Sequence, residues 1–293
     1  MNLSTTVNPQ KAHFELTHKD KILLIGSCFT DEIGDKFTCN GFEILKNPFG
    51  ILYNPLSISV CLDSITNKRY LKEQDLVYSN EYYYAFNCHG DYRGKKKQEC
   101  LEKINLSIDL ANDFLQNTNC IILTFGSMWS YWYTPNNYLM GNCHKIDSKL
   151  IKRRLLNKEE VITALENNIQ QIKQKFNKYI KIIITLSPIR HWREGFHDNM
   201  LSKSHLYILI NDLVNNLENN AYYFPSYEIV MDELRDYRFY KDDLLHISNL
   251  AVDYIWEKFS GAVFSNIEKS KNEDYHKLFL MKNHRPLNQD SEG

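Results

Sequence analysis

The sequence predicts an α/β fold, in which a mostly parallel five-stranded sheet carries helices on both faces. The first observation is that apolar runs of strand length alternate with segments whose apolar residues recur at helical spacing. The second is that several of these runs end at Gly, Ser or Pro. Right-handed crossovers bring the carboxyl ends of parallel strands to one edge of a sheet, so we expect ligands to bind at that edge.

The length and composition allow one large domain. The chain has 293 residues and 43% hydrophobic residues, enough for a sizeable core. No linker, repeat or low-complexity segment marks a boundary. We therefore expect a single domain over residues 1–293, with insertions at about 51–118 and 127–156 at the ligand-binding edge of the sheet.

The charge pattern argues against two classes of partner. Lys and Arg total 35 against 36 Asp and Glu, a net charge of -1, which gives no indication of a nucleic-acid or anionic-membrane partner.

The N-terminal residues lack the pattern of a signal peptide, and no apolar stretch reaches membrane-spanning length. Seven cysteines include no C-x-x-C pair, which fits thiols in a reducing compartment. We expect a soluble, cytoplasmic protein; the oligomeric state cannot be derived.

The first strand ends at a candidate nucleophile. An apolar run from Lys21 stops at Gly26, and a helical pattern follows over 29–37. Ser27 lies between them, at the carboxyl end of a strand and the start of a helix, where developing negative charge is favoured. The alternative is that Ser27 only caps the helix. If Ser27 faces the site, we expect the adjacent Cys28 to point away from it.

The remaining elements follow in alternation. Asn157 marks the start of the helix predicted over 157–176, since Asn157 and Glu160 have the spacing of a capping box. The patterns predict further strands at 41–46, 77–86, 120–126, 179–186 and 222–227, and helices at 55–66, 97–115, 157–176, 202–217 and 249–259.

Two stretches between these elements have an open interpretation. The turn at 47–50 places Gly50 just past a strand, where backbone can approach a ligand, but it can equally be an ordinary turn. The aromatic segment 129–144 contains an Asn136-Asn137 turn and predicts a hairpin. Its aromatic residues fit either the lining of a substrate pocket or packed hairpin core.

A carboxylate and an imidazole near the C-terminus fit the needs of a nucleophile. Asp243 precedes His246 by three residues, a spacing that lets the carboxylate hold one ring nitrogen and leaves the other free to face Ser27. The pattern is also compatible with a surface pair. Its position after the last expected strand favours the catalytic interpretation.

Five motifs in order resemble the GSCFA family, which is similar to the SGNH, or GDSL-like, hydrolases. The resemblance covers nearly the whole chain, from about residue 20 to the tail at 284–286. Its motifs are Gly26-Ser27-Cys28-Phe29, the segment from Asn47 to Pro55, Asn142-Cys143-His144-Lys145, Ser187-Pro188-Ile189-Arg190-His191, and Tyr237-Arg238-Phe239-Tyr240 followed by Asp243-Leu244-Leu245-His246.

The resemblance implies a flavodoxin-like three-layer α/β/α sandwich with strand order 2-1-3-4-5. It implies a catalytic triad of Ser27, Asp243 and His246, with no metal and no cofactor. It also implies that the backbone N–H of Gly50 and that of Ser27 stabilise the oxyanion.

The chain departs from the superfamily pattern after the third strand. The superfamily has Gly-x-Asn-Asp there, and its asparagine completes the oxyanion hole. This chain has Met128 at the asparagine position, and a methionine cannot donate that hydrogen bond. Ser127 and Asn142 are the candidates to replace the amide; alternatively, the activity is weak or of another kind.

The other candidate residues each have a structural alternative. Asn142 and His144 fit either a site or a hairpin. Arg190 and His191 follow a strand end and fit a site for a carboxylate or sugar hydroxyls, while Arg190 also fits a structural ion pair. A metal site built from His89, Asp91, His144 and His191 is disfavoured, because these residues lack the short spacing of metal ligands.

These observations together predict a metal-independent serine esterase. It would hydrolyse a small acyl ester through the triad and an acyl-enzyme. The family resemblance and the aromatic hairpin indicate an O-acetyl group on a carbohydrate as the substrate. One alternative is an O-acyltransferase that uses the same triad. The other is a glycan-binding module that has kept the fold without the chemistry.

Overall fold

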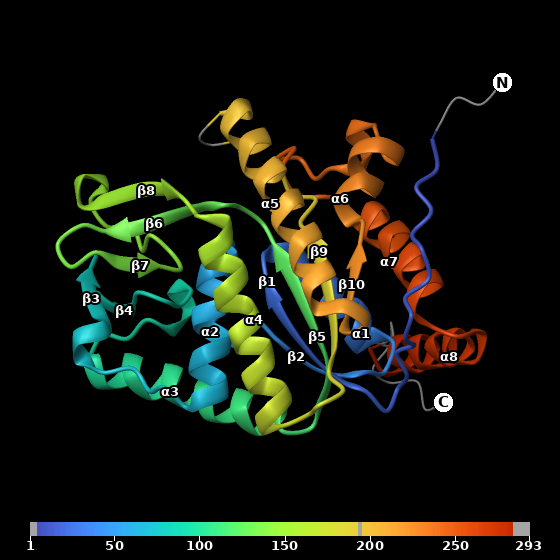
Figure 1. Cartoon of the computed structure of the whole chain (residues 1–293), viewed down its shortest axis with the longest axis horizontal. Coiled ribbons are helices and arrows are strands. Elements are labelled where there is room, and N and C mark those ends of the chain that lie inside the picture. The colour runs from blue at the N-terminus through green and yellow to red at the C-terminus, as the bar shows by residue number, and fades with distance from the viewer. Residues whose placement is uncertain (1–4, 193–194, 284–293) are drawn as a thin grey trace, which may run out of the picture.

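The computed structural model describes residues 5–192 and 195–283, and its centre is a five-stranded sheet (Figure 1). All neighbouring strands are parallel, in the order β10-β9-β5-β1-β2. Numbered along the chain within this sheet, the order is 2-1-3-4-5, as the resemblance implied. The strands are β1 (Lys21–Gly26), β2 (Glu43–Lys46), β5 (Thr118–Phe125), β9 (Lys181–Leu186) and β10 (Ala221–Phe224).

Helices cover both faces of the sheet, so the predicted α/β sandwich is confirmed (Figure 1). One apolar core lies under α2 (Pro55–Asn67), α3 (Lys97–Leu115), α4 (Lys158–Lys175) and α5 (Phe196–Leu217). The other lies under α1 (Cys28–Cys39) and α7 (Asn249–Val263). A short helix α6 (Ser226–Glu228) follows β10, and α8 (Asn266–Asn283) ends the described chain. No helix within these described ranges has the length and apolar character needed to cross a membrane.

The inner strands β1, β5 and β9 are buried on both sides, because their successive side chains point to opposite faces of the sheet and helices cover both faces. In β1, Leu23 and Ile25 belong to the core under α2 to α5, whereas Ile22 and Leu24 belong to the core under α1 and α7. This double burial explains why the strands are almost continuously apolar.

Five further strands form two small antiparallel sheets. The pair β3 (Leu76–Ser79) and β4 (Tyr82–Ala85) replaces the single strand expected over 77–86, so that expectation was wrong. Asn80 and Glu81 both have left-handed backbone angles, φ 46° and 67°, which make a tight hairpin turn. The second sheet has the order β7-β6-β8, with β6 (Trp129–Tyr133), β7 (Tyr138–Met140) and β8 (Ile151–Leu155). The β6-β7 hairpin was predicted; β8 was not.

The segment 47–53 crosses the carboxyl edge of the central sheet. The Asn47 side chain accepts a hydrogen bond from the Gly26 N–H at 2.9 Å, and the Gly26 carbonyl accepts one from Leu52 N–H at 2.9 Å. The carbonyl oxygen of Tyr53 accepts hydrogen bonds from the backbone N–H groups of Gly126 and Ser127. Gly26 itself has no room for a side chain, since a Cβ there would lie 2.3 Å from Thr124 O. The end of β1 is therefore fixed on all sides.

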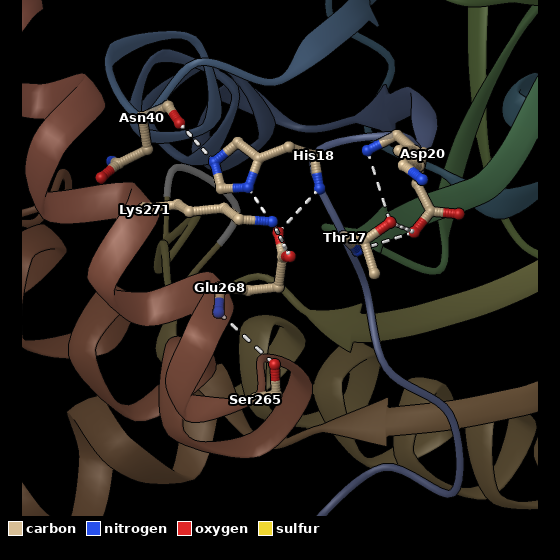
Figure 2. Close-up of polar contacts among 8 residues, drawn as sticks. Thr17, His18, Asp20, Asn40, Ser265, Glu268 and Lys271 are labelled. Atoms are coloured by element: carbon tan, nitrogen blue, oxygen red, sulfur yellow. Dashed lines mark hydrogen bonds and ion pairs between the residues drawn. The ribbon is translucent and has the colours of Figure 1, made fainter.

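Polar groups rather than apolar ones fix α8 to the rest of the chain. Figure 2 shows the His18 ring between Glu268 and Asn40: Nδ1 lies 2.5 Å from Glu268 Oε2, and Nε2 lies 3.0 Å from Asn40 O. Lys271 Nζ lies 2.6 Å from the other carboxylate oxygen of Glu268. The imidazole also stacks on Tyr275, with centroids 4.8 Å apart. The N-terminal segment and the last helix thus hold each other in place.

Candidate active site

Ser27 lies at the end of β1 but turns towards the neighbouring strand. It is the N-cap residue of α1, yet its side chain makes no capping hydrogen bond. Its hydroxyl instead donates to Ser187 Oγ at 3.0 Å, just past the end of β9, and the residue is fully buried. The Ser27 side chain therefore does not cap α1. Ser27 joins the ends of two strands.

Cys28, the next residue, faces the histidine. Its Sγ lies 3.5 Å from His246 Nε2, and the residue is half-buried. The expectation that Cys28 points away from the site was wrong. The physical reason is that α1 begins at Cys28, so the chain turns between two adjacent residues. Alternation of side chains, which applies within a strand, no longer holds at this junction.

Asp243 and His246 form the predicted pair. Asp243 Oδ2 lies 2.6 Å from His246 Nδ1, while Oδ1 accepts hydrogen bonds at 2.9 Å from the backbone N–H groups of Leu245 and His246. Hydrogen bonds from the His246 side chain and from these two amides lower the pKa of Asp243 to about 2. An ionised Asp243 accepts a hydrogen bond from Nδ1–H, which leaves Nε2 as an acceptor that faces the thiol.

Short-range contacts hold the loop that carries this pair. Tyr240 and Ile247 form an antiparallel bridge, and Lys241 N–H donates to His246 O at 2.8 Å. The Lys241 side chain then lies 2.7 Å from Glu32 on α1. The loop is thus tied to the same helix that begins with Cys28. His246 and Cys28 are positioned by one connected set of contacts.

The thiol of Cys28 is neutral at pH 7. Burial, with a smaller contribution from the carboxylates of Asp31 and Glu32, outweighs the effect of the backbone N–H groups of Cys28 and Phe29 and raises the pKa of the thiol to about 11. These N–H groups belong to the first turn of α1, where no helical carbonyl is available to them. The arrangement therefore resembles a serine with its general base more than a preformed thiolate and imidazolium pair.

A buried lysine completes the neighbourhood. Lys203 on α5 is 2% exposed, and its Nζ donates to Ser187 O at 2.7 Å and to Gly126 O at 3.0 Å. Burial lowers its pKa to about 7. No sequence pattern indicated a role for this residue, since a lysine in an amphipathic helix is normally on the solvated face. Ser187 was part of a motif but was given no role.

Arg190 and His191 follow the end of β9. The guanidinium carbon of Arg190 lies 4.6 Å from the ring centroid of Trp192 and 4.4 Å from that of Tyr240. Burial, together with the charges of Lys203 and His246, lowers the pKa of His191 to about 4. The structure therefore brings both predicted residues to the surroundings of His246.

The two amides that the resemblance assigns to the oxyanion are engaged within the fold. Gly50 N–H donates to Asn47 O at 2.7 Å, and Ser27 N–H lies 3.3 Å from Thr124 O. Gly50 has φ 73°, and a Cβ there would lie 2.2 Å from the Cβ of His89. The turn therefore needs its glycine for shape.

The candidates to replace the missing amide at Met128 also have partners. Met128 is fully buried, and its N–H donates to Ser202 Oγ at 2.7 Å. The Ser127 hydroxyl accepts from the Trp129 N–H at 3.0 Å and lies 3.2 Å from Ser202 Oγ. These contacts fasten the start of β6 to α5.

Asn142 and His144 lie in a turn beside β4. Asn142 Oδ1 accepts from His144 N–H at 3.3 Å, and His144 Nε2 donates to Ala85 O at 3.0 Å. The His144 ring stacks on Tyr84, and burial lowers its pKa to about 4. These contacts fit the structural interpretation of His144. His89, of the disfavoured metal set, pairs with Asp91 at 2.8 Å; no group of three or more metal-binding side chains occurs in the part of the chain that is described.

Fold and geometry together define an α/β protein with a thiol, an imidazole and a carboxylate at the carboxyl edge of a parallel sheet. The chain belongs to the GSCFA family, whose sequence profile matches residues 21–259. No curated protein matches it in sequence.

Eleven chains of solved structures match this chain. One is the salicylyl-acyltransferase SsfX3 from a tetracycline biosynthetic pathway, with TM-score 0.44 and 12% identity over 88% of this chain and 55% of that one. This chain thus spans about half of that protein. A carbohydrate esterase of family 3 from Talaromyces cellulolyticus has TM-score 0.40 and 8% identity, over 87% of this chain and 99% of that one. An acetyl esterase mutant with acetate ion has TM-score 0.38, 8% identity and the same coverage. At these values they assign no activity to this chain.

Proposed function

We propose that this protein is an ester-acting enzyme whose nucleophile is the thiol of Cys28, with His246 as general base and Asp243 as its orienting carboxylate. One observation carries the proposal: Cys28 Sγ lies 3.5 Å from His246 Nε2, while Asp243 binds the opposite ring nitrogen at 2.6 Å. A nucleophile next to a base that a third group orients is the arrangement of covalent acyl transfer.

The reaction proceeds in two halves. As the sulfur attacks the ester carbonyl carbon, its proton moves to His246 Nε2. The carbon–oxygen bond to the alcohol then breaks, and the alcohol leaves with the proton from His246. This leaves a thioester on Cys28. In the second half, His246 takes a proton from water, the water oxygen attacks the thioester carbonyl, and the acid leaves while the sulfur regains its proton.

The first turn of α1 supplies donors for the oxyanion. The backbone N–H groups of Cys28 and Phe29 lower the pKa of the Cys28 thiol, so they lie where a negative charge on or beside the sulfur is stabilised. Helix N-termini favour such charge. A donor of this kind typically contributes about 10²–10³ in rate. This assignment does not need an amide at Met128.

The substrate is proposed as a small acyl ester, with the O-acetyl carbohydrate expected from the resemblance as one member of the class. Transfer of the acyl group to another hydroxyl uses the same thioester. The two reactions differ only in which hydroxyl attacks in the second half. Measuring free acetate with and without an added acceptor alcohol separates them.

The test uses 4-nitrophenyl acetate and peptide mapping by mass spectrometry. Cys28→Ala is expected to reduce hydrolysis by about 10³-fold or more and to abolish an acetyl adduct on the peptide that contains residue 28. Cys39→Ala is the matched control, since Cys39 is also half-buried on α1, and it is expected to keep both. Circular dichroism and thermal unfolding establish that each variant folds.

The same experiment decides between the two adjacent candidates. Ser27, the nucleophile that the resemblance implies, stays a prediction. If Ser27→Ala abolishes the adduct while Cys28→Ala retains it, the thiol assignment is overturned in favour of the hydroxyl. If the wild-type protein forms no adduct and hydrolyses no aryl acetate, the proposed ester chemistry is overturned.

A further inference from the structure

Two aromatic rings hold the side chain of Arg190 in place. The guanidinium lies over Trp192 and over Tyr240, at 4.6 Å and 4.4 Å from their centroids. Its Nε is buried and has no hydrogen-bond partner among the described residues. Among the residues that the structure describes, no ion pair includes Arg190. The guanidinium is therefore fixed in orientation and lacks a counter-charge within these ranges.

The acidic groups around the nucleophile are committed to other partners. Asp243 binds His246, Asp31 accepts from Asn47 at 2.8 Å, and Glu32 pairs with Lys241. Lys203 adds a second basic group, with only backbone carbonyls as hydrogen-bond acceptors. Within the described ranges, none of these three carboxylates forms an ion pair with Arg190. Arg190 is half-buried, and a guanidinium that aromatic rings hold in one orientation is well placed to bind an anion through charge-assisted hydrogen bonds.

Arg190 is also close to the catalytic loop. Tyr240, on which it packs, forms the antiparallel bridge with Ile247, next to His246. His191, the next residue, packs against Tyr53 with centroids 5.1 Å apart, and its buried Nε2 has no hydrogen-bond partner in the part of the chain that the structure describes. Two residues that are adjacent in the chain thus each carry a buried nitrogen without a partner in these ranges, Arg190 packed on the loop of His246 and His191 close enough to His246 for its charge to lower the imidazole pKa. Buried polar groups without partners are rare in folded proteins and call for an explanation.

We propose that Arg190 and His191 bind a carboxylate carried by the ester substrate. The inference rests on the proposed function and names its substrate class, esters that bear a second, anionic carboxylate. A guanidinium binds a carboxylate through two parallel hydrogen bonds, which fixes the orientation of the substrate as well as adding affinity. The neighbouring imidazole offers a further donor. Sugar hydroxyls would leave the charge of Arg190 uncompensated.

Two pairs of substrates test the side of the ester on which the carboxylate lies. Phenyl hydrogen adipate and phenyl hexanoate differ by a carboxylate on the acyl side. The pair 3-acetoxybenzoate and 3-acetoxybenzamide differ by a carboxylate on the alcohol side. We expect kcat/KM, divided by the uncatalysed rate, to favour the anion about 10- to 100-fold in one pair, the range for charge-assisted hydrogen bonds.

Arg190→Gln is expected to reduce that preference to about one. Arg238→Gln is the matched control, since Arg238 has its own acid partner, Asp236, at 2.9 Å. It is expected to keep the preference. Arg190→Lys, which keeps the charge but not the two parallel donors, should keep only part of it. Thermal unfolding of each variant checks the fold.

A binding measurement separates failure of this proposal from failure of the proposed function. Titration of adipate and of 3-hydroxybenzoate into the wild-type protein, Arg190→Gln and Arg238→Gln, followed by calorimetry, needs no turnover. Ester hydrolysis without an anion preference in either pair overturns the carboxylate site and leaves the esterase intact. Binding that depends on Arg190, in a protein that hydrolyses no ester, supports the site and overturns the esterase. Equal binding by all three proteins overturns the site.

Discussion

Lys203 Nζ donates a hydrogen bond of 2.7 Å to the carbonyl oxygen of Ser187, although its side chain is buried within the fold. Burial penalises the charged form and lowers the lysine pKa to about 7. Above this pH the native protein releases a proton that the unfolded chain still holds up to its own lysine pKa of about 10.4. The contribution of Lys203 to stability is therefore fully present above that pH and is lost as the pH falls through 7.

Lys203→Met tests this dependence. The free energy of unfolding of the wild-type protein, relative to that of the variant, is expected to rise between pH 7 and pH 10. The slope of this rise has an upper limit of about 1.4 kcal/mol per pH unit, because one proton is involved. Urea denaturation at pH 7, 8 and 9 measures it, and taking the difference between the two proteins removes the other titrating groups. A difference that stays constant with pH would show that Lys203 is charged throughout.

Cys28 is expected to react slowly with iodoacetamide at neutral pH. Because its pKa is raised to about 11 by burial, only a small fraction is thiolate, the reactive form. The alkylation rate should rise about tenfold per pH unit from pH 7 to 10, in proportion to that fraction. Mass spectrometry of the peptide with residue 28 follows the rate, with glutathione as the reference thiol. A rate that is independent of pH in this range would reveal a preformed thiolate.

Asp243→Asn is expected to lower turnover by about 10²–10⁴-fold, because the amide no longer fixes the imidazole tautomer and no longer stabilises its cation. Asp242→Asn provides the control, as it neutralises the adjacent carboxylate. The measurement is kcat for the aryl acetate, together with the melting temperature. Equal activity of both variants would reduce the Asp243 and His246 contact to a surface pair.

Two glycine substitutions should change stability in opposite directions. Gly26→Ala places a Cβ 2.3 Å from Thr124 O and forces β1 and β5 apart, at a cost of about 1–3 kcal/mol or more. Gly261→Ala adds a Cβ in open space on α7 and should stabilise the helix by about 0.5–1 kcal/mol. Chemical denaturation of both variants gives the two values. A neutral Gly26→Ala would mean that the carboxyl edge adapts freely.

Glu268 is expected to carry the docking of α8 (Figure 2). Burial raises its pKa, but hydrogen bonds from Lys271 and from His18 outweigh this and hold the pKa at about 2. Glu268→Gln should cost about 1–3 kcal/mol of unfolding free energy, whereas Glu273→Gln, on the exposed side of α8, should cost little.

The stabilisation by Glu268 is present above the unfolded pKa of about 4.3 and is lost as the pH falls through 2. The difference between the wild-type protein and Glu268→Gln should therefore be smaller at pH 3 than at pH 6.

Much of the fold could be predicted because the central strands and their helices have distinct hydrophobic periods. The capping residue Asn157, for example, accepts from Glu160 N–H at 3.0 Å, as its spacing indicated. The hairpin of β3 and β4 could not be separated from a single strand, since its turn residues, Asn80 and Glu81, are not a typical turn pair. Apolar and aromatic content alone does not show where such a strand reverses.

The site was harder to predict for a geometric reason. Which of two adjacent side chains faces His246 depends on the residue at which the strand becomes a helix, and patterns place such a boundary only to within a few residues. A shift of one residue exchanges Ser27 and Cys28. The burial of Lys203 could not be predicted from the hydrophobic periodicity of its helix either. Its hydrogen-bond acceptors are backbone carbonyls at the ends of β5 and β9, which come together only in the folded chain.

The raised pKa of Cys28 has a consequence for oxidative damage. Hydrogen peroxide oxidises thiolates, and the first product, a sulfenic acid, forms in proportion to the thiolate fraction. A thiol that stays protonated until a substrate and His246 remove its proton presents almost none of this form at rest. The resting protein is thereby protected from peroxide, and inactivation by oxidants should become rapid only at alkaline pH.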